Sequence, residues 1–153
     1  MLITPTTFSL TAGRAEGGTP LTAFDAALLD AGLGNLNLLK VSSIVPPGAR
    51  LVETPAVPPG SLVPVAYGTI TSQDPGQVIS AGVAVGLTGH TFGMIMEYSG
   101  RRPKEEVEAL LERMVHESLE RRGLKATEYY VRAVEHTVAR CGSVFAAVLL
   151  WYD

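Results

Sequence analysis

The sequence predicts an α+β fold in which two β-sheets pack face to face and two helices lie outside them. Sixteen glycines and ten prolines divide the chain into short segments. About seven of these segments are apolar or alternating, as strands are, and two carry apolar residues at helical spacing. The last segment, residues 143–152, is apolar on both faces, which is typical of a central strand covered on both sides.

Composition indicates one folded domain and excludes several classes of protein. The 153 residues are 46% hydrophobic and 18% charged, so the chain can bury a core and is not a disordered one. The low charge also favours an oligomer, and a net charge of −3 argues against a nucleic-acid partner. No apolar run reaches the ~20 residues of a membrane span, and the N-terminus lacks a signal-peptide pattern. We therefore expect a cytoplasmic protein with no membrane partner.

The first helix is predicted by its boundaries. Thr19 is a suitable N-cap, Pro20 favours the first helical position, and Gly32 or Gly34 can end the helix. At 100° per residue its apolar side chains form one arc, and Asp25 falls inside this arc. A carboxylate there is costly unless it meets a partner. Around the helix we expect a strand over 2–11, a flexible loop over 12–18, a strand over 36–45 and an irregular Pro-rich segment over 51–60.

The second helix is the clearest element of the remaining chain. Pro103 begins it, glutamates gather in its first turn and arginines in its last, and Gly123 follows. Small residues in segment 77–88 suit the close approach of two packed layers. The other elements that we expect are a hairpin of residues 62–72 and 77–88, an apolar strand over 92–98 whose one charge is Glu97, and two final strands over 127–139 and 143–152.

Common catalytic and metal-binding motifs are absent from the sequence. It contains no phosphate-binding loop, no dinucleotide fingerprint and no CxxC pair. His90, His116 and His136 share no ligand spacing, so we expect no metal site. Cys141 is the only cysteine, which excludes an intramolecular disulfide, and no neighbour would activate its thiol.

Two adjacent serines, Ser42 and Ser43, stand inside the apolar segment V-S-S-I-V-P-P. A serine pair alone is ordinary at a strand end. Three segments together, however, resemble the pyruvoyl-dependent arginine decarboxylase family in order and spacing: G-T-P-L-T-A-F-D-A-A-L, N-L-L-K-V-S-S-I-V-P-P and G-M-I-M-E-Y-S-G. The resemblance covers nearly the whole chain. It implies an αββα sandwich of two mostly antiparallel sheets, assembled as a homotrimer or a dimer of trimers with active sites between neighbouring subunits.

The resemblance also implies that the single domain, residues 1–153, cuts itself between Ser42 and Ser43 into residues 1–42 (the β chain) and 43–153 (the α chain). The Ser43 hydroxyl would attack the Ser42 carbonyl, and residue 43 would become a covalent pyruvoyl group, the cofactor. Asn37 matches the family's asparagine at this step, and its amide would donate to the Ser42 carbonyl oxygen. The alternative for Asn37 is an ordinary turn or edge residue.

The reaction implied by the resemblance converts L-arginine to agmatine and CO2. The pyruvoyl ketone would form a Schiff base with the substrate amine and accept electrons as CO2 leaves. Glu97 matches the family's proton donor, and desolvation on its apolar strand would raise its pKa, unless the side chain points to solvent. Asp25 matches the residue that holds the guanidinium group; the alternative is an ion pair with Arg14 or another basic side chain of the same chain. Leu38 and Ile44 would line the pocket around the aliphatic part of the substrate.

Two other functions stay open at this point. The first is a decarboxylase of another amino acid on the same fold, although a carboxylate at position 25 favours a cationic side chain. The second is an unprocessed trimeric protein that binds a small molecule or a partner without catalysis. The intact mass of the protein separates an uncut chain from a processed enzyme.

Overall fold

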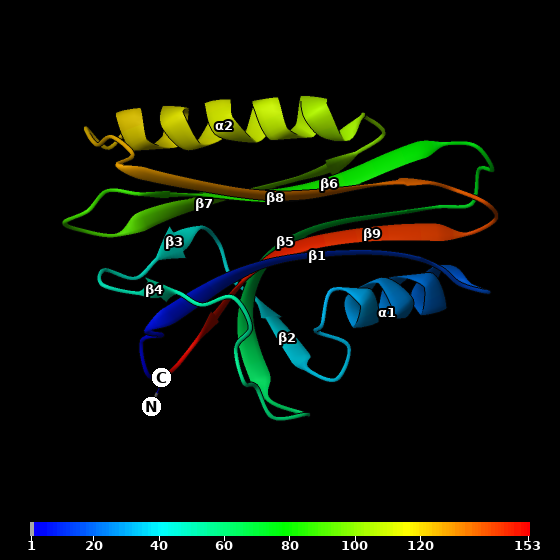
Figure 1. Cartoon of the computed structure of the whole chain (residues 1–153), viewed down its shortest axis with the longest axis horizontal. Coiled ribbons are helices and arrows are strands. Elements are labelled where there is room, and N and C mark those ends of the chain that lie inside the picture. The colour runs from blue at the N-terminus through cyan, green and yellow to red at the C-terminus, as the bar shows by residue number, and fades with distance from the viewer. Residues whose placement is uncertain (1) are drawn as a thin grey trace.

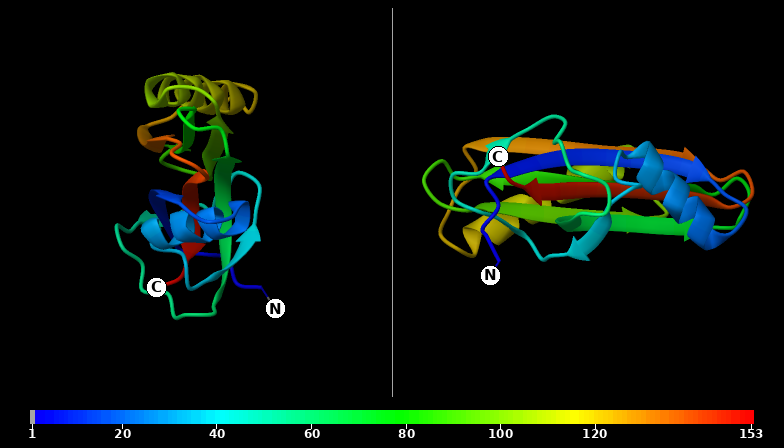
Figure 2. Two further views of the ribbon diagram at one scale, coloured as in Figure 1. Left: turned by 90° about the vertical axis from the view of Figure 1, so that its right-hand side faces the viewer. Right: turned by 90° about the horizontal axis from the view of Figure 1, so that it is seen from below.

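Two β-sheets lie face to face in the computed structural model, which describes residues 2–153, and one helix covers the outer face of each sheet (Figure 1). The first sheet contains β1 (Thr7–Glu16), β2 (Asn37–Lys40), β4 (Arg50–Leu51), β5 (Leu62–Ser72) and β9 (Gly142–Trp151), and α1 (Pro20–Asp30) covers it. The second sheet contains β3 (Ile44–Val45), β6 (Val78–Leu87), β7 (Gly93–Gly100) and β8 (Glu128–Thr137), and α2 (Lys104–Glu120) covers it (Figure 2).

The order of the strands confirms the predicted αββα sandwich. The first sheet runs β2-β5-β9-β1-β4 and the second runs β3-β7-β6-β8. Within residues 2–153 the paired strands are antiparallel except for β1 with β4 and β2 with β5. No helix in this described part of the chain is long and apolar enough to cross a membrane.

Strand β9 is buried on both faces because it lies at the centre of the first sheet. Val144, Ala146 and Val148 belong to the core between the two sheets. Phe145 and Leu149 alternate with them and belong to the core under α1. A strand with a covered layer on each side needs apolar residues at every position, which confirms the prediction for segment 143–152.

Helix α1 begins at the predicted cap and packs unusually close to its sheet. The Thr19 hydroxyl accepts a bond from the backbone N–H of Thr22, and the Thr22 hydroxyl accepts from the backbone N–H of Thr19. Gly32 follows the helix with a positive φ of 82°, as a helix terminator does. A Cβ atom at Gly13 of β1 would lie 2.3 Å from the Ala27 carbonyl oxygen, so only glycine permits this approach.

Strand β6 carries α2 on small residues, as its composition predicts. A Cβ atom at Gly82 would lie 2.8 Å from Leu111 Cδ1, and one at Gly86 would lie 2.5 Å from Val115 Cγ1. Leu111 and Val115 are both fully buried against the strand. The helix can therefore press its apolar face onto the sheet.

The predicted hairpin of residues 62–72 and 77–88 is wrong. Both segments are strands, but β5 pairs with β9 and β2, whereas β6 pairs with β7 and β8 in the other sheet. The turn between them carries the chain from one layer to the other. Apolar periodicity reveals a strand and its buried faces, but it does not reveal the partner.

Two boundaries also differ from the sequence-based expectation. The expected loop over 12–18 is mostly strand, because β1 continues to Glu16, which pairs with Gly142 of β9. The expected strand over 36–45 is broken, because β2 ends at Lys40 in the first sheet and β3 begins at Ile44 in the second. The break contains both serines.

Only part of the predicted apolar arc of α1 is buried. Its buried face consists of Ala23, Ala27 and Leu28, because small side chains suit the close approach at Gly13. Leu21 and Leu29 are 74% and 55% exposed, and Asp25 between them is exposed as well. Residues four apart share one side of a helix. These three residues therefore form an outer stripe on α1 that faces away from the sheet.

Candidate active site

The Ser42–Ser43 peptide bridges the two sheets and is held on both sides. The backbone N–H of Val41 donates to the Val65 carbonyl of β5, at 3.1 Å. The Ser43 carbonyl accepts from the backbone N–H of Ile95 of β7, at 2.7 Å. Ser42 is exposed and Ser43 is half-buried. A peptide fixed at both flanks has less conformational freedom to lose, which favours attack by the hydroxyl of its own Ser43.

Glu97 lies on β7, two residues beyond the strand position that bonds to Ser43. Alternate residues of a strand share a face, so Glu97 lies on the same face as Ile95, which is buried in the core between the sheets. The carboxyl is half-buried. Burial raises the pKa of Glu97 above its ordinary value, and the positive charge of Lys40 opposes this increase. This setting matches the desolvated acid expected from the sequence rather than a solvent-facing glutamate.

Lys40 is a charged group near the site that the sequence analysis did not single out. Its Nζ atom lies 4.7 Å from the centre of the Tyr67 ring, a distance at which the cation and the ring attract each other. It is also the cation that acts on Glu97. The signal in the sequence was one lysine inside the apolar run L-L-K-V, three residues before Ser43.

One chain does not bring the Asn37 amide to the Ser42 carbonyl. Asn37 begins β2 and is exposed at the edge of the first sheet. Its Nδ2 atom donates to the Gly60 carbonyl oxygen at 3.0 Å. Asn37 and Val41 are four steps apart along extended chain, and at ~3.3 Å per step their Cα atoms are about 13 Å apart. In a single chain Asn37 occupies the edge position named as its alternative.

Asp25 also lies away from the serines. Figure 1 shows α1 toward one end of the long axis and β3, which directly follows Ser43, toward the other side of the molecule. Within residues 2–153 Asp25 forms no ion pair with Arg14 or with another basic side chain, and the Arg14 guanidinium donates to the Glu135 carbonyl oxygen at 2.8 Å. Asp25 is thus an exposed carboxylate on the outer stripe of α1.

The two predicted pocket-lining residues occupy different places. Ile44 directly follows Ser43, pairs with Met94 of β7 and is 39% exposed. Its side chain is therefore available beside the bridging peptide. Leu38 lies on β2 and packs against the core under α1, which includes Phe145. Of the two, the fold brings only Ile44 next to Ser43.

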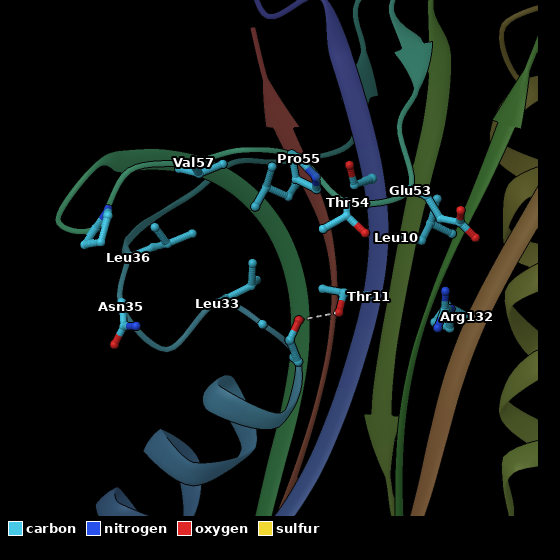
Figure 3. Close-up of a pocket in the computed structure, with 15 residues that line it drawn as sticks. Leu10, Thr11, Leu33, Asn35, Leu36, Glu53, Thr54, Pro55, Val57 and Arg132 are labelled. Carbon is cyan, nitrogen blue, oxygen red and sulfur yellow. Dashed lines mark hydrogen bonds between the residues drawn. The ribbon is translucent and has the colours of Figure 1, made fainter. Parts of the chain in front are cut away.

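Neither a metal cluster nor the best-formed cavity lies at Ser42, Ser43 and Glu97 in the described part of the chain. Within residues 2–153 no three His, Cys, Asp or Glu side chains are arranged to hold a metal ion. A cavity of about 450 Å³ lies between β1, the end of α1 and residues 53–59 (Figure 3). Ser42, Ser43 and Glu97 do not line it.

The chain belongs to the pyruvoyl-dependent arginine decarboxylase family. The sequence model of that family matches residues 7–153. A protein of Methanocaldococcus jannaschii with this name is 49% identical, over 97% of this chain and 91% of the relative. Proteins of the same name from Methanococcus aeolicus and Pyrococcus furiosus are 47% and 43% identical, over 97% of this chain and 91% and 97% of the relatives.

Family membership confirms three of the sequence-based predictions. It confirms the family that the three segments resembled, and it makes the chain an enzyme. It also confirms the cofactor, because the family depends on a covalent pyruvoyl group. The half-buried hydroxyl of Ser43, on a peptide fixed at both flanks, fits the serine from which such a group forms.

Proposed function

We propose that this chain cuts itself between Ser42 and Ser43 and then converts L-arginine to agmatine and CO2. The observation that carries the proposal is the bridging peptide, which is fixed to β5 on one side and to β7 on the other, with the desolvated carboxyl of Glu97 on the same strand. The names of the relatives, pyruvoyl-dependent arginine decarboxylase, support the choice of substrate.

Self-cleavage uses atoms of the chain and one water molecule. The Ser43 Oγ attacks the Ser42 carbonyl carbon, and the peptide nitrogen leaves as an amine, so the amide becomes an ester. Loss of the Ser43 Cα proton then expels the Ser42 carboxylate and leaves dehydroalanine at residue 43. Water replaces its nitrogen, ammonia is released, and residue 43 becomes a pyruvoyl group. The products are residues 1–42 and residues 43–153.

Decarboxylation then depends on an electron acceptor and on a proton donor. The pyruvoyl ketone supplies the acceptor, because it takes up the α-amine of arginine as a Schiff base. Glu97 supplies the proton to the carbon that has lost CO2. Burial favours the neutral carboxyl, and the raised pKa of Glu97 keeps that proton available at a higher pH than an exposed glutamate would.

The substrate side chain is bound by a second copy of the chain. Asp25 accepts two parallel bonds from the guanidinium group, and Ile44 contacts the aliphatic part. Because α1 and β3 lie apart along the long axis of one chain (Figure 1), we assign Asp25 to a neighbour. The outer stripe of α1 presents two exposed leucines beside Asp25, as an interface would. We expect a homotrimer or a dimer of trimers.

We assign the hydrogen-bond donor for the Ser42 carbonyl oxygen to the neighbouring copy as well. An oxyanion that forms at the Ser42 carbonyl needs a hydrogen-bond donor. Since Asn37 of the same chain donates to Gly60 instead, we propose that Asn37 of a second copy approaches Ser42.

Product analysis tests the proposed function. The purified protein is incubated with L-arginine labelled at its carboxyl carbon, and both trapped CO2 and agmatine are measured. We expect equal amounts of the two from the native protein and neither from Ser43→Ala, which lacks the attacking hydroxyl. A cleaved protein that releases CO2 from another amino acid and not from arginine would support the same-fold alternative. An uncut, inactive native protein would support the binding alternative.

A further inference from the structure

The open edge of β1 borders a cavity that the proposed reaction does not use. Strand β4 pairs only with Thr7 and Phe8 of β1, so the edge beyond Phe8 has no strand beside it. The cavity of about 450 Å³ begins there, under residues 53–59 and beside the end of α1 (Figure 3). Its volume lies within the roughly 300–1,000 Å³ of small-molecule sites.

A buried hydroxyl in the cavity wall has no partner. Ser9 lines the cavity and is 3% exposed, and its Oγ atom makes no hydrogen bond. A buried hydroxyl without a partner costs free energy. Its neighbour in the wall, Thr11, donates its hydroxyl proton to the Ala31 carbonyl and so keeps lone pairs that can accept a bond. The Thr11 hydroxyl can bind a polar group that enters the cavity, and the Ser9 hydroxyl can do so once the atoms that cover it move aside.

Two opposite charges stand at one end of the same cavity. Glu53 and Arg132 are both exposed and both line it. Within residues 2–153 they form no ion pair and no side-chain hydrogen bond with each other or with other residues. Figure 3 shows them on the β8 side of the cavity, beyond Leu10. A second hollow of about 350 Å³ shares these three residues, so the charges lie at an open mouth.

The other end of the cavity is apolar. Figure 3 places Leu33, Leu36 and Val57 on the side away from the charges, and these residues belong to or pack against the core under α1. The cavity thus offers an anion and a cation at its mouth, hydroxyls in its middle and aliphatic side chains at its far end.

We infer that this cavity is a second ligand site, separate from the decarboxylation site, which binds a free α-amino acid with an aliphatic side chain. The ammonium group pairs with Glu53 and the carboxylate pairs with Arg132, each through charge-assisted bonds. The aliphatic side chain extends toward Leu33, Leu36 and Val57, and the amino acid's carboxylate or ammonium comes within reach of Ser9. Neither a plain carboxylic acid nor a plain amine satisfies both charges.

Binding of L-leucine to the assembled protein tests the inference. Isothermal titration calorimetry is carried out with L-leucine, with 4-methylpentanoate, which lacks the ammonium group, and with isoamylamine, which lacks the carboxylate. We expect saturable binding of L-leucine and binding at least about tenfold weaker for the two other compounds. Equal binding of all three compounds, or no saturable binding of L-leucine, overturns the inference.

Three variants locate the binding. Arg132→Gln should weaken L-leucine binding at least about tenfold, and Ser9→Ala should weaken it about threefold or more. Ser80→Ala is the matched control, because the Ser80 hydroxyl is also buried without a partner but does not line the cavity. It should leave binding unchanged. If Arg132→Gln and Ser80→Ala bind L-leucine equally well, the ligand lies elsewhere.

The decarboxylation site must be excluded as the binding place. Ser43→Ala cannot form the ketone that would take up an amine, so it should bind L-leucine as tightly as the native protein does. Loss of binding in Ser43→Ala would place L-leucine at the decarboxylation site and overturn the inference. The result does not depend on the proposed function, since the uncut variant is sufficient for the measurement.

Discussion

Glu97 is the residue whose chemistry depends most on its surroundings. Glu97→Gln keeps the size and the hydrogen bonding of the side chain but cannot deliver a carboxyl proton. General acid catalysis is commonly worth about 10²–10⁴-fold, so we expect the variant to cleave normally and to decarboxylate arginine at least about 100-fold more slowly. Glu105→Gln, on the exposed face of α2, is the control. Full activity in Glu97→Gln would remove this residue from the mechanism.

Glu97 should also set the pH dependence of arginine turnover. Its folded-state pKa is raised, so the acid form needed for proton delivery persists above the ordinary titration range of a glutamate. Turnover should fall as the pH rises through this raised pKa. The folded state binds the proton more tightly than the unfolded state does, so Glu97 also lowers the free energy of unfolding as the pH rises through the same range. A kcat profile with no such decline would contradict the assignment.

Glu16 should control stability in acid. Hydrogen bonds from His136, at 2.6 Å, and from the backbone N–H groups of residues 139–141 lower its pKa to about 2, from an ordinary value of 4.5. The stabilisation is therefore complete above pH 4.5 and is lost as the pH falls toward 2. Because Glu16 is exposed and solvent weakens its interactions, urea unfolding at pH 7 should show Glu16→Gln to be less stable by about 0.5–1.5 kcal/mol. The difference should shrink by pH 2; a constant difference would show that the charge is not responsible.

At single positions, the sequence predicted chemistry better than it predicted location. The apolar neighbours of Glu97 were enough to predict desolvation, which the raised pKa bears out. The helical pattern around Asp25 suggested burial, yet close packing at Gly13 selects alanines for the buried face and leaves Asp25 outside. Lys40 was overlooked, because its contact with Tyr67 joins two strands whose pairing the sequence does not specify.

The contact between α1 and β1 is the element whose geometry can be tested most simply. A Cβ atom at Gly13 would lie 2.3 Å from the Ala27 oxygen and 2.6 Å from the Ala31 nitrogen. Both are backbone atoms, so the helix itself must move. Gly13→Ala should lower the free energy of unfolding by about 1–3 kcal/mol. It should also weaken arginine binding, because Asp25 moves with the helix.

The control for that contact is a glycine with space around it. A Cβ atom at Gly18 would meet nothing within 4 Å, and its φ is not positive. Gly18→Ala should therefore leave both stability and arginine KM nearly unchanged. Equal stability of the Gly13 and Gly18 variants in urea would mean that α1 does not need its close approach to the sheet.

At the scale of elements, the sequence predicted both helices and most strands but not how strands pair. Caps and apolar stripes are local, so Thr19 and Pro103 could be located from their neighbours alone. Pairing is not local. Residues 62–72 and 77–88 look like a hairpin in sequence, yet each pairs inside a different sheet. The broken segment 36–45 follows from the same cause, because the crossing between layers interrupts it at Ser42 and Ser43.

At the scale of the whole molecule, we expect each active site to combine residues of two copies of the chain. Asp25→Asn should lose most arginine turnover but still cleave, because a charge-assisted bond to the guanidinium is lost. Co-expression of Asp25→Asn with Glu97→Gln should then restore activity, since about one shared site in four would combine an intact Asp25 with an intact Glu97. No restoration in mixed assemblies would place both residues in one chain's site, contrary to the separation of α1 and β3 (Figure 1).

Self-cleavage at the peptide that bridges the two sheets changes the mass of the denatured protein. We expect two fragments, residues 1–42 and 43–153, with the larger about 17 Da lighter than its serine-started sequence because ammonia is lost when the ketone forms. Ser43→Ala should give one uncut chain. A native protein that keeps the full mass of all 153 residues after long incubation would show that the chain does not cut itself.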